Sequence, residues 1–124
     1  MAVTFTDREL DVIEVLWSAG PATVAEVREQ LADQLAYTTV LTVLRTLEEK
    51  GYVGHREEGK AHRYFPKVAQ SAARRSALTR LVDRVFDGSA ELLLTQLVAD
   101  RNLSDKELAR LRKLLDERPK RGKR

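Results

Sequence analysis

The spacing of apolar residues changes at Gly51, and this change limits the possible folds more than any other feature of the sequence. Before Gly51, apolar residues recur every three or four positions, as on the buried face of a helix. After it, two short segments rich in aromatic and β-compatible residues, 52–56 and 61–65, flank a polar run that contains Gly59. The sequence therefore predicts helices followed by a β-hairpin, which Pro66 closes.

Three helices are expected before Gly51. Thr6 and Thr23 each stand three residues before a glutamate, which is the pattern of a capping box. They predict one helix over residues 7–18 and a second, short helix that ends near residues 33–34. A third helix is expected from about Thr38 to Lys50. The expected buried faces are Leu10, Ile13, Leu16 and Trp17; Val24, Val27 and Leu31; and Val40, Val43, Leu44 and Leu47.

Three helices followed by a hairpin are the arrangement of a winged helix, in which the third helix enters the DNA major groove. The outer face of this helix and the basic residues of the hairpin are then the candidate DNA contacts. They are Thr38, Thr39, Leu41, Thr42 and Arg45 on the helix, and Arg56, Lys60 and Arg63 on the hairpin. Two alternatives stay open: the threonines could be simply solvated, and the three hairpin cations could serve only to discourage edge-strand aggregation.

The residues after position 70 predict further helices, so the expected fold is mainly α with a small β-hairpin. We expect a winged helix-turn-helix over residues 1–68, dimerisation helices over 69–117, and a basic, disordered tail over 118–124. The later helices carry more apolar residues than they can hide alone, which is typical of a partner interface. The expected dimerisation residues are Leu78, Leu81, Val82, Val85, Leu93, Leu97 and Leu111.

Composition excludes several classes of protein. The chain has no cysteine, so it has neither a disulfide framework nor a thiolate metal site. His55 and His62 face each other across the expected hairpin, but two histidines without a third ligand do not make a metal site. We find no phosphate-cradling loop or nucleophile motif, and therefore expect no enzyme activity and no cofactor. The absence of a long apolar run or a signal peptide predicts a cytoplasmic protein without a membrane partner.

The charge is unevenly distributed along the chain. The net charge is +3, but residues 1–50 carry −5 and residues 51–124 carry +8. Residues 1–68 alone carry −3, which is unusual for a module that binds a polyanion. We therefore expect the acidic residues to cluster on the first two helices and at the far end of the third. That clustering would leave the DNA-facing side locally positive.

The run Ala36–Val53, AYTTVLTVLRTLEEKGYV, resembles the recognition helix of the penicillinase-repressor family (BlaI/MecI/CopY). Residues 9–17 resemble the family's first helix, residues 61–64 its wing, and residues 85–89 and 103–108 its C-terminal region. This resemblance implies a bacterial repressor that binds a palindromic operator as a homodimer. The alternative that the residues leave open is a winged-helix module for protein–protein association.

Three departures limit what the resemblance implies. The lack of cysteine excludes the copper site of some members. The Asn-Phe bond at which a regulatory protease cuts others corresponds to Gln96-Leu97, so control by such a protease is doubtful. Some relatives also carry basic residues at the positions of Thr38, Leu41 and Thr46, which predicts a different operator or fewer phosphate contacts here.

Overall fold

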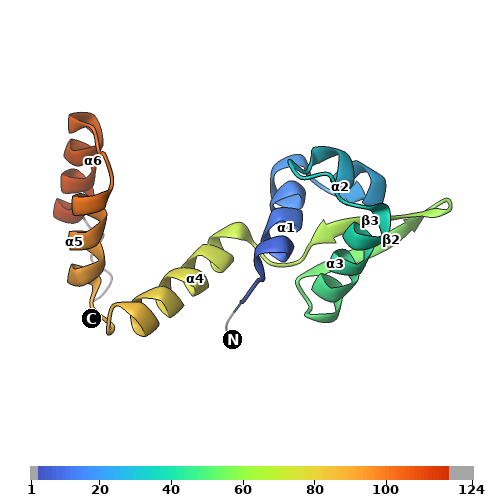
Figure 1. Ribbon diagram of the computed structural model, residues 1–124, viewed down its shortest axis with the longest axis horizontal. Coiled ribbons are helices and arrows are strands. Elements are labelled where there is room, and N and C mark those ends of the chain that lie inside the picture. Colours follow the sequence, from blue (N-terminus) through green and yellow to red (C-terminus); the bar gives the residue numbers. More distant parts are fainter. Residues whose placement is uncertain (1–2, 118–124) are drawn as a thin grey trace. The chain divides into compact units, whose positions relative to one another are not determined.

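The computed structural model describes residues 3–117, and these form six helices and one three-stranded antiparallel sheet (Figure 1). The chain divides into an N-terminal compact unit that ends at Arg80 and a C-terminal unit that begins at Leu81. The expected basic tail, residues 118–124, lies outside the described residues. The elements are α1 (Asp7–Ala19), β1 (Ala22–Thr23), α2 (Val24–Gln30), α3 (Tyr37–Glu49), β2 (Val53–Glu58), β3 (Ala61–Pro66), α4 (Gln70–Val85), α5 (Ala90–Asp100) and α6 (Asp105–Asp116).

Capping boxes begin three of the helices, including the two that the sequence predicts. Thr6 and Glu9 cap α1, Thr23 and Glu26 cap α2, and a Ser104–Glu107 pair caps α6. In each box the hydroxyl accepts a hydrogen bond from the glutamate amide, and the carboxylate accepts one from the capping residue's amide. The expectation that α2 extends to residues 33–34 is wrong. The helix ends at Gln30, because Leu31 takes an extended conformation and packs partly against the core.

The sheet contains the predicted hairpin and one strand that the sequence did not reveal. Strands β2 and β3 pair in antiparallel register, and Gly59 takes a positive φ of 63° in the turn between them. The turn of this hairpin projects beyond the helices of the unit as a wing (Figure 1). The added strand, β1, pairs with the other side of β3, so the strand order is β1-β3-β2. A strand of two residues is too short to show alternation.

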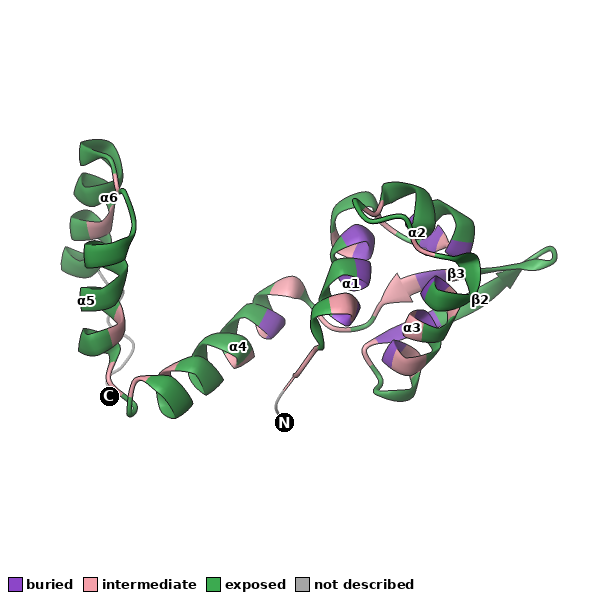
Figure 2. Ribbon diagram, in the orientation of Figure 1, coloured by how far each residue is buried: buried purple, intermediate pink, exposed green. Residues whose placement is uncertain are grey.

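The hydrophobic core lies where α1, α2 and α3 meet the sheet, and the buried residues of Figure 2 concentrate there. On α1 the expected face is partly wrong: Leu10 is 37% exposed, whereas Val12 and Val15 are buried. The buried face begins one residue earlier, at Glu9. Because Glu9 is charged, a search for apolar residues does not find it. On α3 the expected face is confirmed except at Val43, which is only partly buried.

The first turns of α4 belong to the N-terminal unit. Ala73 is buried, and the indole Nε1 of Trp17 donates a hydrogen bond of 2.9 Å to the Val68 carbonyl. The Ser76 hydroxyl accepts a hydrogen bond from the Val3 amide and donates one to the Val3 carbonyl, at 2.9 and 3.2 Å. The N-terminal segment is thereby fixed to α4.

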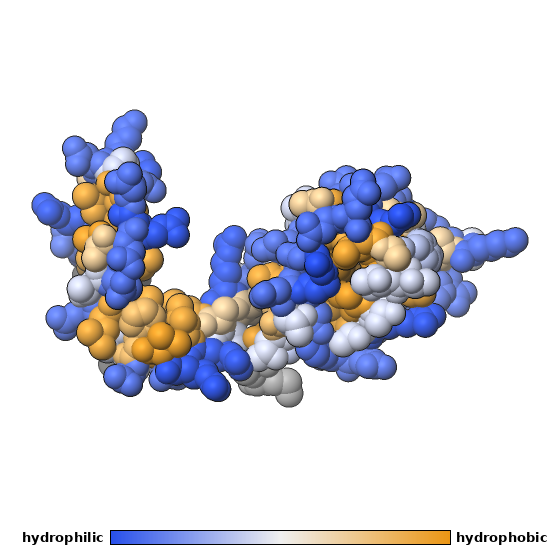
Figure 3. Space-filling model, viewed as in Figure 1, coloured by the Kyte–Doolittle hydropathy of each residue, from blue (hydrophilic) through white to orange (hydrophobic). Residues whose placement is uncertain are grey.

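The C-terminal unit has little core of its own. Neither α5 nor α6 contains a buried residue, although serine side chains cap the first turn of both helices. Asp87 and Gly88, between α4 and α5, take positive φ values of 52° and 74°. Figure 3 shows hydrophobic residues exposed over this unit. No helix within residues 3–117 is long and apolar enough to cross a membrane.

Candidate nucleic-acid interface

Helix α3 has one buried face and one polar, exposed face. Val40, Leu44 and Leu47 are fully buried and fix the helix against the core. The predicted contact residues Thr38, Thr39, Thr42 and Arg45 are all exposed, and Leu41 is half-buried at the edge of this face. The sequence therefore placed the exposed face of α3 correctly.

Two threonines on α3 use their hydroxyl protons within the helix. The Thr42 hydroxyl donates to the Thr38 carbonyl at 2.9 Å, and the Thr46 hydroxyl donates to the Thr42 carbonyl at 3.0 Å. This bond to the preceding turn is common for threonine in helices. It leaves the oxygen lone pairs free to accept, so Thr42 presents an acceptor and a methyl group to a ligand.

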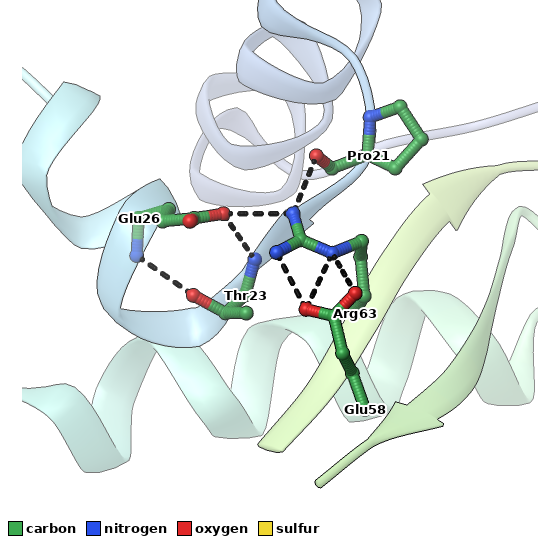
Figure 4. A network of polar contacts seen from close by, with 5 residues as sticks. All are labelled: Pro21, Thr23, Glu26, Glu58 and Arg63. Carbon is green, nitrogen blue, oxygen red and sulfur yellow. Dashed lines mark hydrogen bonds and ion pairs between the residues drawn. The ribbon is translucent and has the colours of Figure 1, made fainter.

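Arg63 lies on β3 in a dense polar network that joins the β2–β3 hairpin to the start of α2 (Figure 4). Its Nε and one terminal nitrogen donate to the Glu58 carboxylate at 2.7–3.1 Å. The other terminal nitrogen donates to Glu26 at 3.0 Å and to the Pro21 carbonyl at 3.1 Å. The sequence predicted a DNA contact for Arg63 and did not anticipate this network. The DNA contact of Arg63 stays a prediction. In this structure its guanidinium is bonded to groups within the protein.

The network shifts the pKa values of Glu26, Glu58 and Arg63. Hydrogen bonds from the Thr23 backbone and from Arg63 hold the pKa of Glu26 below its usual value of 4.5. The hydrogen bonds from Arg63 lower the pKa of Glu58, and the two carboxylates raise the pKa of Arg63. All three groups are therefore charged at neutral pH.

A second polar group joins the end of α3 to the wing. Nδ1 of His55 lies 2.8 Å from the Glu48 carboxylate, and the His55 and His62 rings stack with their centroids 4.3 Å apart. The Tyr64 ring lies beside them, with its centroid 5.4 Å from that of His55, and burial together with the nearby Glu48 charge raises the pKa of Tyr64. The two histidines occupy diagonal rather than opposite positions, because His55 pairs with Tyr64 and His62 with Glu57. Within residues 3–117, no group of three or more metal-ligating side chains is present.

The ion pairs of the N-terminal unit determine which cations are free. Arg8 pairs with Asp11 and Asp33, Lys50 with Glu9, and Arg63 with Glu26 and Glu58. The side chains that make no ion pair within the part of the chain described here include those of Arg45, Arg56 and Lys60, which are three of the predicted contacts. The five carboxylates of these pairs outnumber their three cations by two, so the paired groups hold most of the net charge of −3 of residues 1–68.

The predicted dimerisation residues lie on exposed or half-buried positions of α4, α5 and α6. Leu78, Leu81, Val85 and Leu97 are exposed, and Val82, Leu93 and Leu111 are half-buried. A groove of about 850 Å³ runs between α5 and α6, and Leu97 and Leu111 both line it. The Gln96–Leu97 bond lies inside α5.

Comparison with known proteins places this architecture in a family. The model of the penicillinase repressor family matches residues 5–117. The chain belongs to the penicillinase repressor family. The transcriptional regulator BlaI of Mycobacterium tuberculosis is 36% identical over 107 residues, covering 70% of this chain and 78% of the regulator. A penicillinase repressor of Bacillus licheniformis is 26% identical over 120 residues, covering 95% and 94%. These relatives are named as regulators of transcription, not as enzymes.

A solved structure of a family member carries DNA. The monomeric form of Bacillus licheniformis BlaI, in complex with the blaP half-operator, superposes with a TM-score of 0.50 at 28% identity. The match covers 58% of this chain and 90% of that structure. The winged-helix fold predicted from the sequence is therefore confirmed.

Proposed function

We propose that this chain is a bacterial transcriptional repressor that binds a palindromic DNA operator as a homodimer in the cytoplasm. Helix α3 enters the major groove, and the β2–β3 wing contacts the flanking backbone. The predicted contacts are Thr38, Thr39, Leu41, Thr42 and Arg45 on α3, with Arg56 and Lys60 on the wing.

The polar, exposed face of α3 carries this proposal. A helix fixed to the core on one side and lined with threonines and an arginine on the other presents the groups that major-groove recognition uses. Thr42 can accept a hydrogen bond from a base and place its methyl group against thymine. Arg45 lies one turn further along and can bind guanine or a phosphate.

The exposed apolar residues of the C-terminal unit support the homodimer. Since neither α5 nor α6 contains a fully buried residue in a single copy, a second copy can supply the missing hydrophobic contacts. A two-fold dimer presents two α3 helices to two half-sites, which matches a palindromic operator.

The test begins with DNA fragments selected from a random pool by the purified full-length protein. Replacing Thr42 and Arg45 together by alanine should abolish retention of the selected fragment while leaving folding and dimerisation intact. Arg112→Ala, which removes an exposed cation from α6, is the matched control and should bind normally. If the α3 variant retains the fragment as well as the control does, α3 does not bind the DNA.

The salt dependence of binding tests the phosphate contacts of the same complex. Each phosphate neutralised by a lysine or arginine contributes about −0.9 to the slope of log affinity against log salt. Arg45, Arg56 and Lys60 in both copies predict a clearly negative slope. A slope near zero would contradict the proposed interface, whatever the affinity at low salt.

A further inference from the structure

The network around Arg63 joins three segments that are separate in the sequence. Glu58 lies on the wing, Glu26 on the first turn of α2, and Pro21 in the turn before β1 (Figure 4). The Arg63 side chain is only 22% exposed. We call this set of Pro21, Glu26, Glu58 and Arg63 the wing clamp.

The wing clamp depends on the shape of the guanidinium. Its donors point outward in a planar fork, so one arginine binds two carboxylates and a carbonyl at the same time. All three of its nitrogens are engaged at 2.7–3.1 Å. A lysine in the same position would keep the charge but not this geometry.

The strand pairing between the hairpin and the segment before α2 is short. Strand β1 has two residues and pairs with β3 only at Ala22–Tyr64 and Thr23–Arg63. Arg63 lies in the second of these pairs. Its side chain therefore adds hydrogen bonds at the position where the pairing between β1 and β3 ends. Val53 and Tyr64 are fully buried and fix the inner part of the hairpin to the core, so the wing clamp bears on the outer part, beyond the β1 pairing.

The charges of the wing clamp argue against direct phosphate binding by Arg63. Two carboxylates surround one guanidinium, so the cluster carries a net charge of −1 and disfavours an approaching phosphate. Arg56 lies directly opposite Arg63 in the hairpin, and its charge helps to lower the pKa of Glu58, but it makes no ion pair within residues 3–117, so its guanidinium stays available. In the proposed complex Arg56 is therefore the better phosphate ligand of the two.

We propose that Arg63 is a positioning residue that holds the wing at the angle needed for DNA binding, while Arg56 and Lys60 make the wing's phosphate contacts. This inference rests on the proposed function. It gives Glu26 and Glu58 a role that favours binding, although both are acidic and lie beside the proposed DNA-binding surface.

Charge-conserving and charge-removing variants of the full-length protein test the inference against the selected DNA fragment. Arg63→Lys keeps the positive charge but breaks the wing clamp, and should weaken binding about tenfold; direct phosphate binding by Arg63 predicts little change. Glu58→Gln should weaken binding about threefold, although it removes a negative charge near DNA. Glu57→Gln is its matched control, since it removes the neighbouring carboxylate without touching the wing clamp, and should not weaken binding.

Hydroxyl-radical footprinting separates a positioning role from a general loss of structure. Arg63→Lys should reduce protection only at the positions flanking the half-site, where the wing lies, and keep the protection given by α3. Trp17 fluorescence should show that the variant remains folded under the conditions of the binding experiment.

The outcomes also separate this inference from the proposed function. If the wild type binds the fragment and Arg63→Lys and Glu58→Gln bind equally well, the positioning role is wrong and the proposed function stands. Stronger binding by Glu58→Gln than by Glu57→Gln would also overturn the positioning role. That result would mean that Arg63 helps DNA binding more once it is released from Glu58. If the wild type selects no DNA, the proposed function itself fails.

Discussion

Glu9 illustrates how one charged residue can be part of a core. Its side chain is 6% exposed, yet its carboxylate accepts hydrogen bonds from the Thr6 amide at 2.9 Å and from Lys50 Nζ at 2.8 Å. Burial raises its pKa, but the bonds from Lys50 and Thr6 outweigh burial and hold the pKa below 4.5. The sequence identified Glu9 as part of a capping box. It could not reveal Lys50, which is distant along the chain.

Replacing Glu9 by glutamine should lower the free energy of unfolding of the N-terminal unit by about 1–2 kcal/mol, because Lys50 loses a charged partner at a partly buried site. Urea unfolding followed by Trp17 fluorescence measures this loss. Glu14→Gln, on an exposed position of the same helix, is the control and should change stability little. Equal losses in both variants would show that the ion pair adds nothing.

The pH dependence of the same pair has a definite sign. Because folding lowers the pKa of Glu9, its contribution to stability is fully present above the unfolded pKa of about 4.5. The contribution disappears as the pH falls through the lower, folded value. The difference in stability between the wild type and Glu9→Gln should therefore be constant near neutral pH and shrink below pH 4.5. A difference that grows on acidification would contradict this assignment.

At the scale of elements, the wing shows what local patterns can predict. The hairpin was visible in residues 52–65 because strand alternation, aromatic residues and Gly59 all act locally. The α2 boundary, strand β1 and the wing clamp were missed, because each depends on residues that only the tertiary fold brings together. Glu26 was noticed only as a capping residue, and no local signal connects it to Arg63.

Within the wing, Gly54 leaves room for an aromatic ring. It pairs with Phe65, and a Cβ at position 54 would lie 2.9 Å from the Phe65 ring. Gly54→Ala should therefore destabilise the N-terminal unit by about 1–3 kcal/mol, as overpacking does. Urea unfolding measures the loss, and adding Phe65→Leu should recover part of it by removing the ring. If the loss of stability in the double variant equals the sum of the losses in the two single variants, the contact between position 54 and the Phe65 ring is not the cause.

At the scale of the whole molecule, the expected domain boundary can be tested by truncation. The sequence predicted a boundary at residue 68, but Ala73 and Ser76 on α4 pack with the N-terminal unit. A chain that ends at Arg80 should be a folded monomer that binds DNA weakly. A chain that ends at Val68 should unfold at a lower temperature, because it lacks these contacts. Equal melting temperatures would support the boundary at residue 68.

The dimer interface can be tested by a single charge. Leu97→Asp places a carboxylate on the α5–α6 groove, so it should yield monomers and weaken operator binding. Sedimentation velocity measures the first effect and DNA retention the second. Thr95→Asp, an exposed polar position on the same helix, is the control for the effect of aspartate on α5 itself. A Leu97→Asp dimer as stable as that of the control would place the interface elsewhere.

The lack of buried residues in α5 and α6 has a consequence for gene control. Under the proposed function, these helices gain a core only when two copies meet, so assembly is a second-order process. At chain concentrations below the dissociation constant of the dimer, the amount of dimer rises with the square of the chain concentration. Operator occupancy then responds steeply to synthesis and dilution, and a modest fall in the number of copies per cell is enough to release the gene.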